Sequence, residues 1–232
     1  MVSILIANED LHMIKELING VIGKNKRIKI AKIATSQEET IEILKNGEVD
    51  VAILYLNSTR FEAKEIFDAI YKDKYVDSII TINRNFEEAK QVIENKMIFD
   101  YIIEGSNKDE MIYKINRIIE CKDIDEKRKK IIKELKYIGY NIEHVGTNYL
   151  IDTILQLHIN KELRLDNLQQ DVYPIVSKIY NESVHNIKCN INRATECMYY
   201  ECDSKRLREY FGFCDDTKPR AKTVVFTVLN KI

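Results

Sequence analysis

Residues 50–59 read DVAILYLNST, an apolar run that ends in a polar loop. The run is rich in branched side chains and does not alternate with polar ones, which is typical of a strand covered on both faces. Similar runs recur along the first half of the chain, each followed by a helical pattern. The expected strands are 2–7, 28–34, 51–56, 78–83 and 100–105. This alternation predicts an α/β fold with a doubly wound, five-strand parallel sheet.

The stretch 36–47 shows how one of the expected helices begins and ends. Ser36 is followed three residues later by Glu39, which is the spacing of a capping box at a helix start. Gly47 stands where glycine commonly ends a helix, because it adopts a left-handed conformation without steric cost. These signals predict a helix between the second and third strands.

Length and composition are those of an ordinary globular protein. The 232 residues suffice for two modest domains, and the formal net charge is −1. A charge this small gives no overall attraction to nucleic acid or to anionic lipid. The sequence has no run of about 18 apolar residues, and its start, MVSILIANED, turns acidic too soon for a signal peptide. We therefore expect a cytoplasmic protein without a membrane segment.

The five cysteines are expected to be reduced thiols, because nothing in the sequence indicates export. Cys189, Cys197, Cys202 and Cys214 lie close together in the sequence, and His185 is near them. Their spacing matches no familiar zinc motif, and free cysteine is usually a small core residue. We expect no metal site and no cofactor.

Polar residues stand at the ends of the expected strands, at the edge of the sheet where such folds place their sites. The residues at these ends are Asn8, Glu9, Asp10, Tyr55, Thr81, Ile82, Asn83, Glu104 and Gly105. The sequence has no glycine-rich phosphate loop, which argues against a familiar nucleotide site. Carboxylates placed here can hold Mg²⁺ weakly, but Glu9 and Asp10 are better explained as favourable residues at a helix start.

The order of strands, helices and loops in residues 1–122 resembles the receiver domain of response regulators. In that family an acidic pair binds Mg²⁺, and the resemblance places the pair on Asn8 and Glu9, next to Asp10. The aspartate that accepts the phosphoryl group falls on Tyr55.

The resemblance also assigns roles to the fourth and fifth strands. The hydroxyl residue that senses the phosphoryl group falls on Ile82, one residue from Thr81. The lysine that pairs with the phosphoryl group falls on Glu104, and the proline after it falls on Gly105. Tyr101 stands where the family has an aromatic switch residue.

These replacements remove the reaction of the family. Phosphoryl transfer needs a nucleophile, a metal ion and a cation on the transferred oxygens. Tyr55 offers a phenol with an ordinary pKa of about 10, and Glu104 puts a negative charge where a positive one is required. We expect a degenerate receiver that cannot accept phosphate and that serves for packing and homodimerisation.

The second half of the chain has a different character. Residues 123–136 are dense in charge and show no hydrophobic stripe, so we expect a charged linker or a solvated helix there. The basic run 127–130 within it is either a phosphate contact or ordinary solvated surface. From 137 to 232 the helical periodicity predicts an all-α bundle of about six helices.

Residues 173–201 predict two helices joined by a tight turn. The first ends at Tyr180, and the second begins at about Ser183. The second helix has a stripe that we expect to be buried, formed by Ile187, Ile191, Ala194 and Met198. Its other faces carry His185, Asn186, Lys188, Cys189, Asn192 and Arg193. Such a pair fits a helix-turn-helix, although any amphipathic pair of helices has a similar pattern.

The same half holds a second, more specific set of residues: Gly139, Gly146, Tyr149, Leu150, Tyr173, Pro174, Lys178, Asn181, Ala194, Glu196, the YFGF at 210–213 and the stretch 217–232. Through these residues it resembles the effector domain of the stage-zero sporulation protein A family of sporulation regulators. That family also places a receiver in front of the effector domain. The resemblance implies a regulator from a two-component system that binds double-stranded DNA and acts in transcription and sporulation.

The resemblance places the DNA contacts on the second helix of the pair. The family has several arginines and a glutamate there, whereas this chain has the six polar residues named above. Asparagine can pair with adenine, and lysine or arginine with guanine, so we expect base recognition with a different set of bases.

Phosphate contacts are expected from a later basic group. This group is formed by Lys205, Arg206, Arg208, Lys218, Arg220 and Lys222. The alternative is a solvated basic edge balanced by Asp215 and Asp216, because 137–232 holds about 12 basic and about 12 acidic residues.

Two functions are compatible with these features. The first is a phosphorylation-independent transcription regulator that binds double-stranded DNA as a homodimer. The alternative is a protein-interaction antagonist that pairs with a true response regulator and binds no specific DNA. A third hypothesis, an enzyme that uses Glu9, Asp10 and Glu104, is the least compatible of the three.

Overall fold

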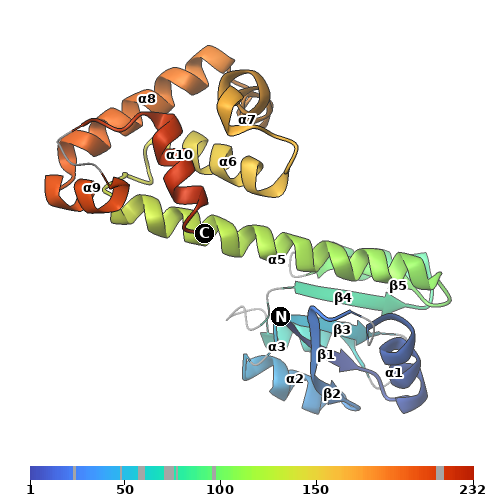
Figure 1. The fold of residues 1–232 in the computed structure, drawn as a ribbon. Coiled ribbons are helices and arrows are strands. Elements are labelled where there is room, and N and C mark those ends of the chain that lie inside the picture. The colour runs from blue at the N-terminus through green and yellow to red at the C-terminus, as the bar shows by residue number, and fades with distance from the viewer. Residues whose placement is uncertain are drawn as a thin grey trace. The chain divides into compact units, whose positions relative to one another are not determined.

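The computed structural model describes residues 1–22, 25–47, 49–56, 61–70, 76, 78–95, 98–212 and 217–232. The chain folds as two units, Met1–Cys121 and Lys122–Ile232, and each has its own hydrophobic core. Figure 1 shows a sheet with helices in the first unit and helices in the described part of the second. Helix α5 (Lys108–Tyr137) contains the division between the units. In the described ranges, no helix is both long enough and apolar enough to cross a membrane.

The first unit is built on a five-strand parallel sheet with the order β2-β1-β3-β4-β5. The strands are β1 (Val2–Ala7), β2 (Ile28–Ala34), β3 (Val51–Tyr55), β4 (Ser78–Asn83) and β5 (Ile98–Ile103). This order is one of the two common doubly wound arrangements, so the predicted α/β fold is confirmed. Three strands lie at the predicted residues, whereas β3 ends one residue earlier and β5 begins two residues earlier.

Helices cover both faces of this sheet (Figure 1). They are α1 (Leu11–Leu17), the π-helix η1 (Ile18–Ile22), α2 (Gln37–Lys45), α3 (Ala63–Ile70), α4 (Phe86–Ile93) and the first part of α5. On one face α1 and α5 pack against Ile53, Tyr55 and their neighbours. On the other face α2, α3 and α4 pack against Leu54 and its neighbours. This double cover explains why the strands are continuous apolar runs in the sequence.

The predicted helix signals at 36–47 are present in the structure. Ser36 is the N-cap of α2, and its Oγ accepts a hydrogen bond from the Glu39 backbone N–H at 3.2 Å. The Glu39 carboxylate accepts from the backbone N–H of Thr35 at 2.8 Å, one residue earlier than in a capping box. Gly47 follows the helix with a φ of +65°, as a residue that ends a helix in the left-handed conformation.

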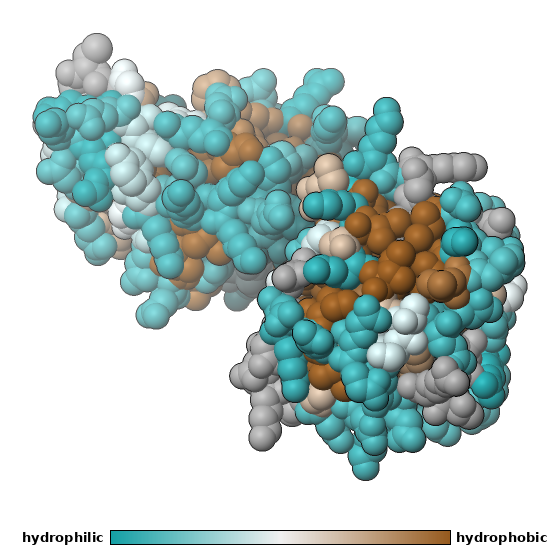
Figure 2. Space-filling model, turned by 90° about the horizontal axis from the view of Figure 1, so that it is seen from below, coloured by the Kyte–Doolittle hydropathy of each residue, from teal (hydrophilic) through white to brown (hydrophobic). Residues whose placement is uncertain are grey.

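Strand β2 lies at one edge of the sheet, with β1 as its neighbour. Ile33 in this strand is 40% exposed although it is a large hydrophobic residue. Figure 2 faces this side of the first unit and shows hydrophobic surface gathered there. An exposed apolar patch beside an open strand edge is a surface suited to association with another protein.

The second unit is all-helical in its described residues. After α5 its helices are α6 (Val145–Ile159), η2 (Leu165–Asn167), η3 (Leu168–Val172), α7 (Tyr173–Tyr180), α8 (Val184–Glu201), α9 (Ser204–Phe211) and α10 (Ala221–Leu229). Their apolar sides share one core, to which α6 contributes Leu150, Ile151 and Ile154 and α10 contributes Val224 and Val225. The predicted all-α second half is confirmed.

Residues 123–136 are helical over their whole length, as part of α5. Ile131 and Leu135 are fully buried in the core of the second unit, and Ile124 packs against that core. The expectation of a segment without a hydrophobic stripe is therefore wrong. These three residues are seven and four positions apart, so they share one side of a helix with 3.6 residues per turn. We propose that the second domain begins within α5, before residue 137.

The structure also corrects the expectation for Lys127 and Arg128, which have partners inside the protein. Arg128 donates to one carboxylate oxygen of Asp152, and the Tyr180 hydroxyl donates to the other. Asp152 is buried, so this carboxylate joins α5, α6 and α7. Burial, followed by the bond to Asp152, raises the pKa of Tyr180 to about 12. Lys127 Nζ donates to the backbone oxygen of Ile232 at 2.7 Å.

Helices α6 and α8 approach each other closely at Gly146. A Cβ atom at position 146 would lie 2.0 Å from the backbone oxygen of Asn190 and 3.1 Å from the Cβ of Ala194. The first distance is far shorter than a van der Waals contact, and backbone atoms cannot move aside as a flexible side chain can. Glycine is therefore required for this contact between the two helices.

We predict that Gly146→Ala lowers the free energy of unfolding by about 1–3 kcal/mol or more, because the added methyl group forces α6 and α8 apart. Chemical denaturation of the full chain, followed by circular dichroism, measures this loss. Gly212→Ala is the matched control: Gly212 has a φ of +71°, and no atom of the described residues lies within 4 Å of the added Cβ, so only backbone strain of about 1 kcal/mol is expected. Equal losses in the two variants would contradict the steric explanation.

Candidate receiver-type site and nucleic-acid interface

The first strand ends in a polar loop that starts α1. Asn8 is buried, and its Oδ1 accepts from the backbone N–H of Asp10 at 2.9 Å. Asp10 is the N-cap of α1 and accepts from the His12 backbone N–H at 2.7 Å. Glu9 is exposed between them. Asp10 therefore caps α1, in agreement with the interpretation that it favours the start of a helix.

Tyr55 lies at the end of β3 and is only 3% exposed. It stands in register with Ile82 of β4 and belongs to the core between the sheet and helices α1 and α5. Burial, and then the negative charges of Glu104 and Glu16, raise its pKa to about 12. The phenol therefore stays protonated at neutral pH and is a poor nucleophile.

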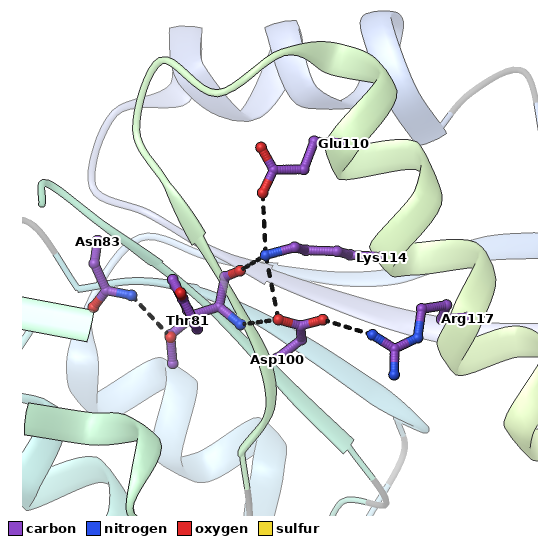
Figure 3. Close-up of polar contacts among 7 residues, drawn as sticks. Thr81, Asn83, Asp100, Glu110, Lys114 and Arg117 are labelled. Carbon is purple, nitrogen blue, oxygen red and sulfur yellow. Dashed lines mark hydrogen bonds and ion pairs between the residues drawn. The ribbon is translucent and has the colours of Figure 1, made fainter. Parts of the chain in front are cut away.

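The end of β4 carries the hydroxyl group of Thr81, one residue before Ile82, where the receiver resemblance places the residue that senses the phosphoryl group. Ile82 is buried on the same side of the sheet as Tyr55. Thr81 points to the opposite side, since neighbouring strand residues alternate. Its Oγ1 accepts a hydrogen bond from Asn83 Nδ2 at 2.9 Å, as Figure 3 shows.

The end of β5 carries Glu104, whose backbone N–H donates to the Asn83 oxygen at 2.8 Å. Gly105 follows with a φ of +82°, so the chain turns there through a conformation that favours glycine. The exposed Glu104 carboxylate therefore occupies the place that the receiver resemblance gives to a lysine.

A lysine does lie beside β5, but it is already engaged. Lys114 of α5 donates to the backbone oxygen of Tyr101, and its Nζ lies 3.3 Å from Asp100 Oδ1 and 3.2 Å from Glu110 Oε1 (Figure 3). Its Nζ also lies 4.6 Å from the centroid of the Tyr101 ring. Arg117 approaches the second oxygen of Asp100 at 3.4 Å. These contacts fasten α5 to β5 and leave Lys114 held by carboxylates.

Metal-binding side chains do not converge in the part of the chain that the structure describes. Within it, no three His, Cys, Asp or Glu side chains are placed to share a metal ion. Cys121, Cys189, Cys197 and Cys202 are free thiols. Cys214, the fourth cysteine of the sequence cluster, lies outside the described residues, as do Asp215 and Asp216.

Helices α7 and α8 form the predicted pair with a tight turn. Asn181 adopts the left-handed conformation, with a φ of +51°, and ends α7 at Tyr180. Ser183 is the N-cap of α8, and its Oγ accepts from the Asn186 backbone N–H at 3.1 Å. The predicted buried stripe is confirmed for all four residues: Ile187, Ile191, Ala194 and Met198. The core therefore holds one side of α8 and leaves the other side to solvent.

The solvent side of α8 carries the six residues expected to contact DNA. His185, Asn186, Lys188, Asn192 and Arg193 are exposed, and Cys189 is partly buried. Several have local partners: Lys188 Nζ donates to Gln169 Oε1 at 3.0 Å, Asn186 Nδ2 donates to Glu182 Oε2 at 3.0 Å, and Cys189 Sγ lies 3.4 Å from His185 Nε2. Arg193 makes no side-chain hydrogen bond or ion pair with any residue that the structure describes.

The later basic residues fall on different elements. Lys205 and Arg206 are exposed on α9, and Arg206 donates to the Tyr137 oxygen at 3.3 Å while its guanidinium lies over the Tyr137 ring. Lys218, Arg220 and Lys222 lie before and at the start of α10. They line a cavity of about 620 Å³ together with Lys188 and Asn192 of α8.

Sequence reasoning missed this cavity and its acidic members. Lys218 pairs with Glu196, and Lys222 pairs with Asp166 at 2.7 Å. Hydrogen bonding to Lys222 lowers the pKa of Asp166, and hydrogen bonding to Glu196 raises the pKa of Lys218. The paired residues are 22 and 56 positions apart, so no local pattern could have revealed them.

Comparisons with known proteins give results for both halves. Residues 131–232 match the family model described as sporulation initiation factor Spo0A C terminal. No curated protein sequence matches the chain. Among solved structures, the receiver domain of AraT, a response regulator from Geobacillus stearothermophilus, is 16% identical, with a TM-score of 0.45, over 53% of this chain and 98% of that one.

Two further solved structures are similar over the same half. A DNA-binding response regulator of the LuxR family from Staphylococcus aureus is 13% identical, with a TM-score of 0.46, over 51% of this chain and 98% of that one. A chain of the CheX–CheY complex from Borrelia burgdorferi is 16% identical, with a TM-score of 0.44, over 51% of this chain and 89% of that one. The first half of the chain thus has a doubly wound sheet with the order β2-β1-β3-β4-β5, and residues 131–232 match the family model of the Spo0A C-terminal domain.

Proposed function

We propose that the chain is a DNA-binding transcription regulator with the architecture of a response regulator and a first domain that accepts no phosphoryl group. The α7–α8 pair carries this proposal, because its tight turn and its half-buried second helix fit a helix-turn-helix. A receiver-like fold followed by a Spo0A C-terminal domain supports a regulator of transcription rather than an enzyme.

The exposed side of α8 has the chemistry needed to contact bases. Asn186 and Asn192 can each pair with adenine through two hydrogen bonds, and Lys188 and Arg193 suit guanine. His185 and Cys189 complete the proposed contact set. Binding strength has to come from local charge, because the basic and acidic residues of 137–232 balance.

Basic residues outside α8 are proposed as phosphate contacts. They are Lys205 and Arg206 on α9 and Arg220 and Lys222 at the start of α10. Such contacts position a protein on the duplex without reading its sequence. Their contribution falls as salt rises, because each releases counterions from the DNA.

The first domain is proposed to act as a scaffold for a homodimer. Its buried Tyr55 and its acidic Glu104 argue against phosphoryl transfer, as does the engagement of Lys114 by carboxylates. The apolar surface beside β2 supports association with a second copy (Figure 2). A response regulator with an intact receiver is the alternative partner.

We predict that acetyl phosphate with Mg²⁺ leaves the chain unmodified, because the site has no aspartate acceptor on β3. Mass spectrometry of the intact protein, with a phosphorylatable receiver as positive control, checks this. A mass increase of one phosphoryl group that hydroxylamine removes would contradict the proposal.

We predict that Tyr55 has a packing role. Tyr55→Ala should lower the free energy of unfolding by about 3–5 kcal/mol, because it opens a cavity in the core. Tyr55→Phe should change it little, since the hydroxyl has no hydrogen-bond partner among the described residues. Denaturant titration measures both variants; a large loss in Tyr55→Phe would show that the hydroxyl itself has a task.

We predict that the full chain selects specific duplexes from a random pool and that Arg193→Ala weakens binding to them by about 1–3 kcal/mol. Fluorescence anisotropy at several salt concentrations measures the loss, and Lys136→Ala, an exposed position near the end of α5, is the control for a lost charge. If the chain selected no sequence at low salt and instead captured an intact receiver, the antagonist function would replace this one.

A further inference from the structure

The cavity beside α8 has the size and the lining of a small-molecule site. Its volume is about 620 Å³, within the range of about 300–1,000 Å³ that is usual for ligand pockets. Its walls come from η2, η3, the start of α7, α8 and the start of α10. All these elements belong to the second unit, so the cavity is complete within one domain.

One part of the lining is apolar. Leu168, Tyr173 and Ala221 are buried residues that line the cavity, and Leu165 and Pro219 lie with them. Apolar lining of this kind favours a ligand with a hydrophobic or ring portion, because that portion leaves water on binding. An inorganic anion has no apolar portion, so the apolar lining does not add to its binding.

The other part of the lining is basic. Lys188, Lys218, Arg220 and Lys222 face Asp166 and Glu196, which leaves two positive charges in excess. Arg220 makes no side-chain hydrogen bond or ion pair with any described residue. Its guanidinium is therefore available for an anion, and guanidinium groups bind phosphate through paired hydrogen bonds.

The two ion pairs at this cavity restrain their lysines only weakly. In the pair of Lys218 and Glu196 the side chains are 42% and 50% exposed, and in the pair of Lys222 and Asp166 they are 51% and 87% exposed. Exposed pairs of this kind contribute little to stability. A doubly charged phosphate can draw both lysines away from single carboxylates.

We propose that this cavity binds a small organic phosphate, with the phosphate on Arg220 and the neighbouring lysines and the ring on Leu168, Tyr173 and Ala221. The apolar lining favours such a ligand over a phosphate of the DNA backbone, which carries no group to cover it. Lys188 and Asn192 line the cavity and also belong to the proposed DNA-contacting side of α8. The ligand therefore competes with DNA, a consequence that rests on the proposed function. Such a site supplies a signal input in a chain whose first domain accepts no phosphoryl group.

Isothermal titration calorimetry of the full chain with adenosine 5′-monophosphate tests the site, with adenosine and pyrophosphate as separate arms. We expect the monophosphate to bind measurably at up to about 1 mM and at least about tenfold more tightly than either adenosine or pyrophosphate. Absence of binding in this range overturns the proposal. Equal binding of pyrophosphate and the monophosphate also overturns it, because it shows a bare phosphate site of the kind that a DNA backbone fills.

Two glutamine variants locate the binding. Arg220→Gln should weaken binding of the monophosphate by about tenfold or more. If Arg220→Gln unfolds the domain, Lys218→Gln should show the same loss of affinity. Lys161→Gln removes one exposed charge outside the cavity and should leave the affinity within about twofold. Equal effects of the cavity and control variants would place the ligand elsewhere.

Duplex binding measured with and without the monophosphate separates the two proposals. Weaker duplex binding by wild type and Lys161→Gln in its presence supports the competition, and unchanged duplex binding refutes it. If the chain binds the monophosphate but no duplex, the proposed function fails and the site stands. If it binds duplex but no monophosphate, the site fails and the function stands.

Discussion

The close contact of α6 and α8 at Gly146 is the constraint on which the second domain depends. The backbone oxygen of Asn190 lies where a side chain would begin, so the two helix backbones nearly touch. This contact seats α8 with its apolar stripe in the core and its polar side in solvent. Asp152 adds a polar contact, because its two carboxylate oxygens accept hydrogen bonds from Arg128 of α5 and Tyr180 of α7. The turn before α8 is thereby held to the rest of the domain.

The architecture of the first domain does not depend on the polar groups at its strand ends. The sheet order depends on buried apolar strands and on right-handed crossovers, and neither requires a working site. At the strand ends, Tyr55 is part of the core and Asp10 caps α1. The charged groups near β5 bind one another, as Lys114, Asp100 and Glu110 show. These contacts attach α5 to β5.

Electrostatics in the second domain act locally. The basic and acidic residues of 137–232 balance, yet four basic side chains meet at one cavity beside α8. Two of them are restrained by exposed carboxylates and one lacks a described partner. An anion that enters here meets an excess of positive charge that the composition of the domain conceals.

The sequence by itself determined the parts of this protein that follow from local periodicity. The five strands, the turn after Tyr180 and the stripe from Ile187 to Met198 were all predictable, because each depends on residues close together in the chain. The tyrosine at the end of the third strand was also visible from the sequence. Only the tertiary structure decided what depends on distant residues. It gave Arg128 a buried partner, made 123–136 part of a core and assembled the cavity from five separate elements. Burial and charge pairing depend on distances in space, and those distances exist only after the helices have packed.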